Sequence, residues 1–368
     1  MSLELVATPP LAADHVDLQS RLQRAKRAYT TRHVPLAHCT RLLDNPVLAP
    51  RAGDLVLARV TRVGKHATLE GPDSRRSALF PGDEIVVAYA ARYAPDQFEA
   101  RVPDSLGPCH LAAGGGVAAL VTARHAGVAA PTELQPIGLL ARGDRRINLT
   151  DYARCGPAVN PMGPRPLTIA SLGTSMNAGK TTSAAYLVRG LAAAGIRVGA
   201  AKVTGTGSGN DPGLLRDAGA APVLDFTDVG YASTAGLQLP TLLDILNRIQ
   251  AAMSAQGVEA LVIEVADGLL QRETAMLLGS ALFSQWVDAC LFSSGDAMGA
   301  VAGVRWLHDN GLPVLALAGT LTHSPLARAE AEAATRLKTL GLAELADPAC
   351  AKQLLVRAGD LAFGGAVA

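Results

Sequence analysis

The stretch GTSMNAGKTT (173–182) follows the apolar run LTIASL (167–172) and opens an amphipathic segment. A glycine-rich turn between a buried strand and a helix is the setting of a phosphate-binding loop. Backbone N–H groups of such a loop and of the helix N-terminus point at phosphate oxygens, and Gly179 lets the backbone approach without a Cβ. The strict pattern has glycine at position 174, where this chain has Thr174 with Gly173 one residue earlier.

We predict that this loop binds the phosphates of a nucleotide. Lys180 supplies a mobile positive charge to the transferring phosphoryl group, and the Thr181 hydroxyl is the expected Mg²⁺ ligand. A chance GKT at a helix start is the alternative, but strand, loop and helix coincide here, which favours nucleotide binding. The predicted nucleotide-contacting residues are Gly173, Thr174, Ser175, Met176, Asn177, Ala178, Gly179, Lys180, Thr181 and Thr182.

Around this loop, continuous apolar strands alternate with amphipathic helices. Such strands imply a parallel sheet that is covered on both faces. We therefore predict an α/β P-loop NTPase domain over 167–368, with a mostly parallel sheet flanked by helices. The expected strands are 167–172, 196–203, 221–226, 259–267, 288–294 and 312–319, and the expected helices are 179–194, 240–256, 271–283, 298–310 and 325–341.

The first part of the chain has a different texture. Over 48–155, short β-branched runs are separated by Gly, Pro and Asp turns, which predicts a smaller β-rich domain, a barrel or a sandwich. A Pro/Gly-rich linker over 156–166 marks the boundary, because such a segment continues neither a helix nor a central strand. The segment 1–47 is predicted to be partly helical. Its basic stretch 21–33 is read as a solvated helix face, with a phosphate-contacting patch as the alternative.

Composition excludes several classes of protein. The chain has 368 residues, enough for two domains, and its 33 basic residues against 32 acidic ones argue against a dedicated nucleic-acid binder. The five cysteines form no CxxC pair, so neither a zinc knuckle nor a disulfide framework is indicated. The start has no basic region followed by a long apolar run, and no uncharged apolar stretch is long enough to cross a membrane. We expect a cytoplasmic protein.

Lysine is scarce, since only six of the basic residues are lysines. Lys202 ends the second predicted strand beside TGTGSGN, where a mobile cation can orient a substrate carboxylate or neutralise charge on a phosphoryl group. A snorkelling surface lysine is the alternative. Glu264 ends the apolar strand VIE, and a buried carboxylate at that position favours Mg²⁺ binding. A helix cap or structural acceptor is the alternative for Glu264, and Asp267 is the second choice as ligand. Asp296 is read as a helix N-cap.

These residues resemble a known family. Gly173-Thr174 followed by GKT (179–181), with Lys202, Glu264 and SSGDAMGAVAGV (293–304) in order, looks like dethiobiotin synthetase and the cobyrinic acid a,c-diamide synthase group. The resemblance covers about 165–330. It implies catalytic roles for Lys180, Lys202 and Glu264, and a homodimer with substrate near the interface. The implied metal ligands are Thr181, Glu264 and either Asp211 or Asp217.

The resulting prediction is a Mg²⁺-dependent, nucleotide-hydrolysing enzyme, an ATP-dependent ligase or phosphotransferase that activates a carboxylate of a small molecule. The sequence does not distinguish ATP from GTP as the nucleotide, because the segment AGTLTHSP (318–325) lacks the Asn that usually recognises the base. The alternative is a nucleotide-gated switch or cofactor-delivery protein whose β-rich domain binds a partner. A nucleic-acid module that uses 21–33 is a weaker third hypothesis.

Overall fold

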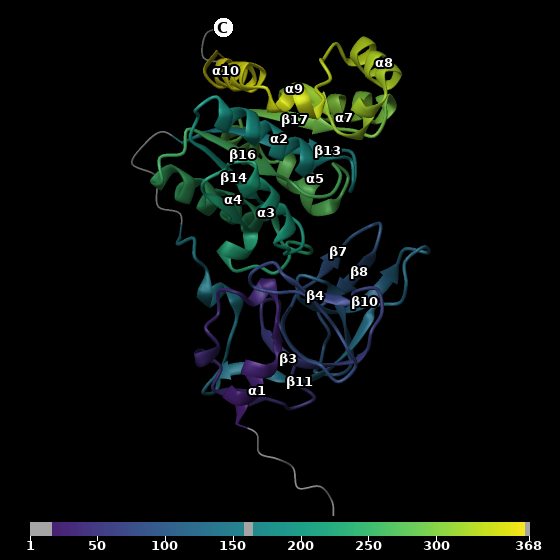
Figure 1. Ribbon diagram of the computed structural model, residues 1–368, viewed down its shortest axis with the longest axis vertical. Helices are drawn as coiled ribbons and strands as arrows, with labels where there is room; N and C mark the ends of the chain where they lie inside the picture. Colours follow the sequence, from purple (N-terminus) through teal and green to yellow (C-terminus); the bar gives the residue numbers. More distant parts are fainter. Residues whose placement is uncertain (1–16, 158–164, 365–368) are drawn as a thin grey trace, which may run out of the picture.

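The computed structural model describes residues 17–157 and 165–364, and its strands fall into two main sheets. One sheet belongs to residues 17–157, the barrel part, and the other to residues 165–364, the α/β part. The two parts are stacked along the long axis of the molecule (Figure 1). Most of the predicted linker lies outside the described residues. A sheet of parallel strands flanked by helices, with a separate β-rich part, confirms the predicted fold class.

The sheet of the α/β part is entirely parallel, because five consecutive crossover connections return each strand in the same direction. Its strand order is β15-β14-β16-β13-β17-β18, so the strand before the glycine-rich loop is central. The strands are β13 (Leu167–Gly173), β14 (Val198–Lys202), β15 (Val223–Asp225), β16 (Ala260–Glu264), β17 (Ala289–Ser293) and β18 (Val314–Ala318).

Helices cover both faces of this sheet. Successive strand residues such as Ile169 and Ala170 point into two different apolar cores, which explains why the strands read as continuous apolar runs. One face carries α2 (Lys180–Ala193), α3 (Asn210–Asp217), α9 (Leu342–Ala346) and α10 (Pro348–Gly364). The other carries α4 (Leu239–Ala255), α5 (Arg272–Leu278), α6 (Ala281–Trp286), α7 (Ala297–Asp309) and α8 (Pro325–Thr335).

Three predicted features of the α/β part differ from the structure. The helix expected over 271–283 is two helices, because α5 ends at Leu278, before Gly279, and the Ser280 side chain caps α6. The helix expected over 325–341 ends at Thr335, since Arg336 adopts a left-handed φ of 63°. The short helix α3 was not predicted, and Asp217, one of the two candidate metal ligands, is its last residue.

The barrel part closes on itself. Five of its strands form a ring in the order β6-β3-β11-β9-β10, and β10 pairs again with β6. Of the two predicted alternatives, the structure therefore has the barrel. The ring strands are β3 (Leu55–Arg62), β6 (Glu84–Tyr89), β9 (Cys109–Ala113), β10 (Val117–Arg124) and β11 (Thr132–Arg142). Shorter strands are β1 (Lys26–Arg27), β2 (Arg41–Leu43), β4 (Thr68–Glu70), β5 (Arg76–Ala78), β7 (Arg92–Tyr93), β8 (Phe98–Arg101) and β12 (Arg145–Arg146).

The basic stretch 21–33 is not one solvated helix, so that prediction is wrong beyond its first turn. Helix α1 (Leu18–Arg24) ends at Arg24, and β1 then pairs with β6 of the ring. The following 3-10 helix η1 (Tyr29–Thr31) is buried, because it lies between the barrel and the α/β part. The other 3-10 helices are η2 (Leu36–His38), η3 (Leu149–Tyr152), η4 (Phe226–Val229) and η5 (Thr320–His323). No helix in the two described stretches is long and apolar enough to span a bilayer.

Candidate functional site

The glycine-rich loop joins the end of the central strand β13 to the start of α2. Gly179 adopts a φ of 104°, and a Cβ there would lie 2.9 Å from the Gly319 Cα. A Cβ on Gly173 would lie 2.9 Å from both the Lys180 Cγ and the Ser293 carbonyl oxygen. Both positions therefore need glycine for steric reasons. The loop presents the free N–H groups at the start of a 14-residue helix, which is a favourable place for an anion.

Lys180 lies within the loop rather than in solvent. Its Nζ donates a hydrogen bond to the Ser175 carbonyl oxygen at 2.7 Å, and the residue is 6% exposed. Burial lowers the pKa of Lys180, although the nearby Glu264 and Asp267 oppose that effect. The Lys180 amine therefore lies inside the curve of the loop, where it could contact a bound phosphate.

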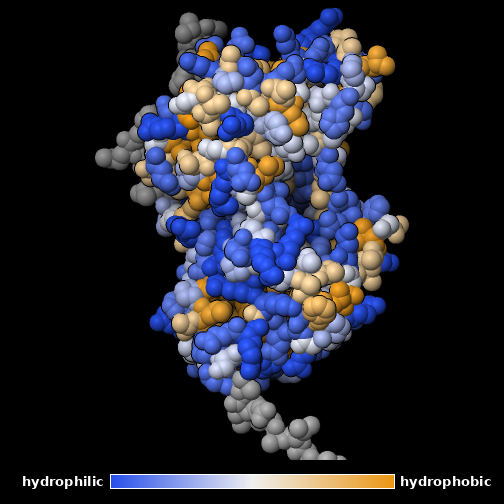
Figure 2. Space-filling model, viewed as in Figure 1, coloured by the Kyte–Doolittle hydropathy of each residue, from blue (hydrophilic) through white to orange (hydrophobic). Residues whose placement is uncertain are grey.

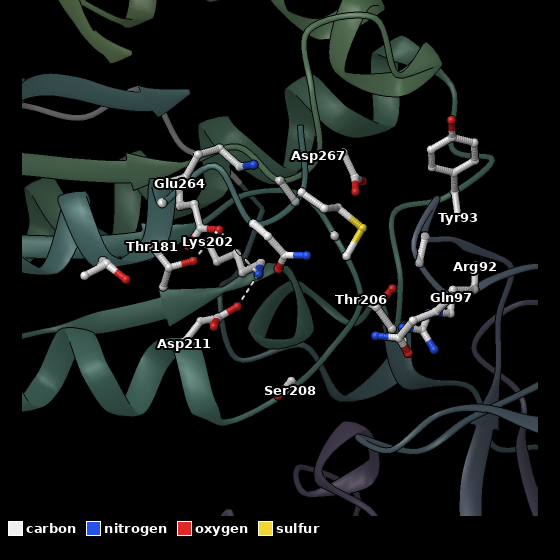
Figure 3. Close-up of a pocket in the computed structure, with 18 of the residues that line it drawn as sticks. Arg92, Tyr93, Gln97, Thr181, Lys202, Thr206, Ser208, Asp211, Glu264 and Asp267 are labelled. Carbon is white, nitrogen blue, oxygen red and sulfur yellow. Dashed lines mark hydrogen bonds and ion pairs between the residues drawn. The ribbon is translucent and has the colours of Figure 1, made fainter. Parts of the chain in front are cut away.

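Thr181 and Glu264 meet beside the loop, although 83 positions separate them in the chain. Strands β13 and β16 are parallel neighbours, so the end of β16 lies next to the first turn of α2. The Thr181 Oγ1 donates to the Glu264 Oε1 at 3.0 Å (Figure 3). Glu264 is 3% exposed, and its Oε2 has no hydrogen-bond partner among the described residues. A buried carboxylate oxygen without a partner is costly, so this oxygen is suited to a cation.

These two side chains fit a Mg²⁺ ion. Mg²⁺ is bound in nucleotide sites by one or two protein oxygens together with waters and substrate phosphates. The Thr181 hydroxyl and the free Oε2 of Glu264 are such oxygens. Within residues 17–157 and 165–364, no group of three His, Cys, Asp or Glu side chains is arranged to hold a metal ion.

Lys202 ends β14, in register with Glu264 on β16 and with Asp225 on β15. Its Nζ forms an ion pair with Asp211 and lies 3.6 Å from the Glu264 Oε1. Burial by itself lowers the pKa of Lys202, but Glu264 and Asp211 outweigh burial and raise it. The side chain is only 12% exposed, so this lysine is a largely buried cation and not a snorkelling surface residue.

The structure separates the two candidate aspartates. Asp211 lies in the first turn of α3, borders the same cavity as Thr181 and pairs with Lys202. Asp217 is the last residue of α3, is exposed and does not line the cavity. The geometry brings Asp211, and not Asp217, to the glycine-rich loop. As predicted, Asp296 caps α7, because its side chain accepts a hydrogen bond from the Gly299 N–H at 2.7 Å.

A cavity of about 560 Å³ lies between the glycine-rich loop and the barrel part. Loop residues from Met176 to Thr182, except Ala178, form one wall with Lys202 and Asp267. Arg92 and Gln97, from the β7–β8 region of the barrel part, lie on the opposite wall (Figure 3). Sequence analysis missed this contribution, because no motif marks it. Figure 2 shows that the junction between the parts is mainly hydrophilic on the face in view.

Specific contacts hold the two parts together around this cavity. Glu70 accepts hydrogen bonds from the Ser208 hydroxyl at 2.9 Å and from the Gly209 N–H at 3.1 Å. The Asn177 side chain in the glycine-rich loop donates to Asp96 at 3.0 Å. A further contact between the two parts joins η1 to β15, where the Tyr29 hydroxyl donates to Asp225 at 2.9 Å. The loop that follows Lys202 is therefore fixed by the barrel part.

The glycines at 114–116 form the turn between β9 and β10, and this turn also contacts the α/β part. A Cβ on Gly115 would lie 1.9 Å from the Gly207 carbonyl oxygen, so the two backbones are in direct contact. The Thr30 N–H donates to the Gly115 carbonyl oxygen at 3.0 Å. The close approach explains why glycine is needed at this turn, and it gives no indication of an anion site.

Comparisons with known proteins add little. No protein-family model and no curated protein matches the sequence. Among solved structures, the chain is similar to the signal recognition particle 54 kDa protein from Aeropyrum pernix K1 in complex with GDP, with 19% sequence identity and a TM-score of 0.36. That match covers 59% of this chain and 55% of the other, so the chain spans about half of that protein's length.

Proposed function

We propose that this protein is a Mg²⁺-dependent enzyme that binds ATP or GTP at the glycine-rich loop and cleaves the γ-phosphoryl group. The observation that carries the proposal is the contact between Thr181 and Glu264, which places a hydroxyl and an incompletely bonded carboxylate beside the loop. The start of α2 and the Lys180 amine lie at the same place. Donors for phosphate oxygens and ligands for a cation thus adjoin one another.

Each side chain has its own task in this proposal. Lys180 exchanges its bond to the Ser175 carbonyl for one to a phosphate oxygen. Thr181 and Glu264 would hold Mg²⁺, and the bound ion would neutralise negative charge on the phosphates. Lys202 stays protonated because of its carboxylate neighbours and stabilises charge on the phosphoryl group as it is transferred.

We further propose that the γ-phosphoryl group passes to a carboxylate of a small molecule in the cavity. A carboxylate oxygen bonds to the γ-phosphorus, the bond from that phosphorus to the bridging oxygen breaks, and the nucleoside diphosphate leaves. A cavity of about 560 Å³ is within the usual size range of small-ligand sites. The resemblance of the loop, Lys202 and Glu264 to the dethiobiotin synthetase group supports a carboxylate as the acceptor.

A nucleotide-gated switch is the second candidate, and one observation favours it. Lys202 is followed directly by the loop whose Ser208 and Gly209 hold Glu70 of the barrel part. A change at the phosphate end of β14 would therefore reach the junction of the two parts. Product analysis separates the candidates: an enzyme with an acceptor yields a phosphorylated or condensed small molecule, whereas a switch yields only nucleoside diphosphate and phosphate.

The direct test of the proposed function is release of phosphate from ATP and from GTP by the purified full chain with Mg²⁺. Lys180→Ala should lower turnover about 100-fold or more, in the range found when one donor to a developing charge is removed. Lys352→Ala is the matched control, because Lys352 is an exposed lysine on α10. Equal turnover by wild type and Lys180→Ala would refute the proposal.

A further inference from the structure

Asp267 stands out in the loop that follows β16. It adopts a φ of 64°, a left-handed conformation that residues other than glycine seldom take and that is concentrated at functional sites. The next residue fixes this turn, because a Cβ on Gly268 would lie 2.2 Å from the Thr174 carbonyl oxygen. The backbone of Asp267 is thus held against the glycine-rich loop.

The side chain of Asp267 borders the cavity and makes no polar contact that would stabilise the fold. Among the described residues, no hydrogen bond or ion pair holds its carboxylate, whereas the neighbouring Asp211 pairs with Lys202. Figure 3 shows the carboxylate directed into the space between the loop residues and Tyr93 of the barrel part. A half-buried carboxylate on a strained backbone, with no structural partner, indicates a role toward a ligand.

Charges from four elements act on this carboxylate. Burial raises the pKa of Asp267 above that of an ordinary aspartate, and Glu273 on α5 adds to the effect. Lys180 on α2, Lys202 on β14 and Arg92 on β7 oppose it. Asp267 therefore takes up a proton more readily than an exposed aspartate, as a proton acceptor in catalysis must.

We propose that Asp267 is the general base that takes the proton from the nucleophile in this site. The inference rests on the proposed function. In hydrolysis, a water oxygen bonds to the γ-phosphorus, the bond to the bridging oxygen breaks, the nucleoside diphosphate leaves, and the water proton goes to an Asp267 oxygen. A carboxylate acceptor carries no proton at neutral pH, so phosphorylation of the acceptor does not need this base.

The proposed base instead acts in a second step, in which another nucleophile attacks the phosphorylated carboxylate, and it indicates the chemical class of that nucleophile. After the mixed anhydride has formed, an amine or hydroxyl attacks its carbonyl carbon, phosphate leaves from that carbon, and the N–H or O–H proton goes to Asp267. We therefore assign the final substrate of the site to molecules with an amine or hydroxyl, or to water. Asp267 faces the space that such a nucleophile would enter between the two parts.

The test compares Asp267→Asn and Asp267→Gly with wild type in the full chain. Both variants should lose about 100- to 10,000-fold in phosphate release, the usual contribution of general-base catalysis. ADP affinity should be unchanged, and the Tm should stay equal or rise, because both residues tolerate a left-handed φ. Wild-type turnover should fall at acidic pH, because Asp267 becomes protonated. The residual turnover of the two variants should not show this fall. Added formate should restore part of the turnover of Asp267→Gly.

Arg336→Gly is the matched control, because Arg336 has a similar φ of 63° at the end of α8, away from the cavity. It should leave turnover unchanged. Wild-type-like turnover of Asp267→Asn overturns the inference while leaving the proposed function intact. A joint loss of ADP affinity, or no rescue by formate, makes Asp267 a structural residue and also overturns it. Absence of turnover in wild type would refute the proposed function itself, and this inference with it.

Discussion

The Thr181 hydroxyl donates a hydrogen bond to the Glu264 carboxylate at 3.0 Å, across the carboxyl end of the parallel sheet. The two residues come from neighbouring elements, the first turn of α2 and the end of β16. The second carboxylate oxygen of Glu264 has no hydrogen-bond partner among the described residues, so the pair leaves one buried acceptor without a donor.

Substitutions at this pair should change the Mg²⁺ dependence of turnover. Thr181→Ala and Glu264→Gln should each lower phosphate release about 100-fold or more, because each removes a proposed ligand of the ion. Thr181→Ser keeps the hydroxyl and should retain most of the activity. Steady-state turnover against Mg²⁺ concentration is the measurement. If Thr181→Ala and Thr181→Ser behaved alike, the hydroxyl would have no role.

Lys202 should contribute to stability as well as to turnover. Lys202→Met leaves the buried Glu264 without its nearby cation and Asp211 without its partner, which should cost about 3–5 kcal/mol in the free energy of unfolding. Lys202→Met combined with Asp211→Asn should recover part of that loss. Urea unfolding of the four proteins checks this. Additive effects of the two substitutions on the free energy of unfolding would show that Lys202 and Asp211 do not stabilise each other.

The pH dependence of that contribution follows from the raised pKa of Lys202. A lysine whose folded-state pKa lies above its unfolded value stabilises the fold fully below the unfolded pKa, about 10.4, and loses the contribution as pH rises through the folded value. The difference in unfolding free energy between wild type and Lys202→Met should therefore be constant from pH 7 to about pH 10. A steady decline over that range would contradict the assignment.

Acid should weaken the junction of the two parts through Asp228. His33 lies 2.8 Å from its Oδ1 and Arg32 lies 3.3 Å from it. Burial raises the pKa of Asp228, but the hydrogen bond to His33 and the charge of Arg32 outweigh burial and lower it. A lowered folded-state pKa gives stability above the unfolded value of about 3.9, and that stability is lost as pH falls through the folded value.

Asp228→Asn should therefore lower the unfolding free energy at pH 6 and flatten its decline below about pH 4. Urea unfolding between pH 3 and pH 6 measures both effects. Glu133→Gln, which removes the exposed partner of Arg62, is the control and should change stability by less than about 1 kcal/mol. Parallel curves for wild type and Asp228→Asn would show that Asp228 does not titrate in this range.

Glycine 179 allows a test that separates backbone strain from steric blocking of the loop. Gly179→Ala places a Cβ 2.9 Å from the Gly319 Cα, whereas Gly311→Ala meets nothing within 4 Å, and both have a positive φ. Each should cost about 1 kcal/mol or more in stability because of φ. Only Gly179→Ala should also weaken nucleotide binding. Equal nucleotide affinity in the two variants would remove Gly179 from the site.

Sequence analysis reached the fold class and the local geometry of the loop because both depend on contiguous patterns. The apolar run 167–172, the glycine-rich turn and GKTT predict strand, loop and helix directly. The contact between Glu264 and Thr181 also follows from the predicted parallel sheet, because parallel strands end at one edge of a sheet. The single helix expected over 271–283 was wrong, since the periodicity continues through Gly279, where the chain turns.

The remaining features depend on how the two parts dock, and docking has no local signature in the sequence. Arg92 reaches the cavity because the barrel closes and its Gly115 turn meets Gly207. Nothing near Arg92 in the chain indicates a ligand site. The conformation of Asp267 likewise follows from the contact between Gly268 and Thr174, which are far apart in sequence. The choice of Asp211 over Asp217 required the unpredicted helix α3.

In the proposed function, the glycine-rich loop binds nucleotide phosphates through Lys180. Equilibrium titrations of ADP and of GDP, each with Mg²⁺, into wild type, Lys180→Ala and Lys352→Ala test this binding. A hydrogen bond to a charged group contributes about 1.5–3 kcal/mol, so Lys180→Ala should raise Kd about 10- to 100-fold while Lys352→Ala leaves it unchanged. A Kd for Lys180→Ala equal to that of wild type, or no saturable binding of either nucleotide to wild type, would refute the proposed role of the loop.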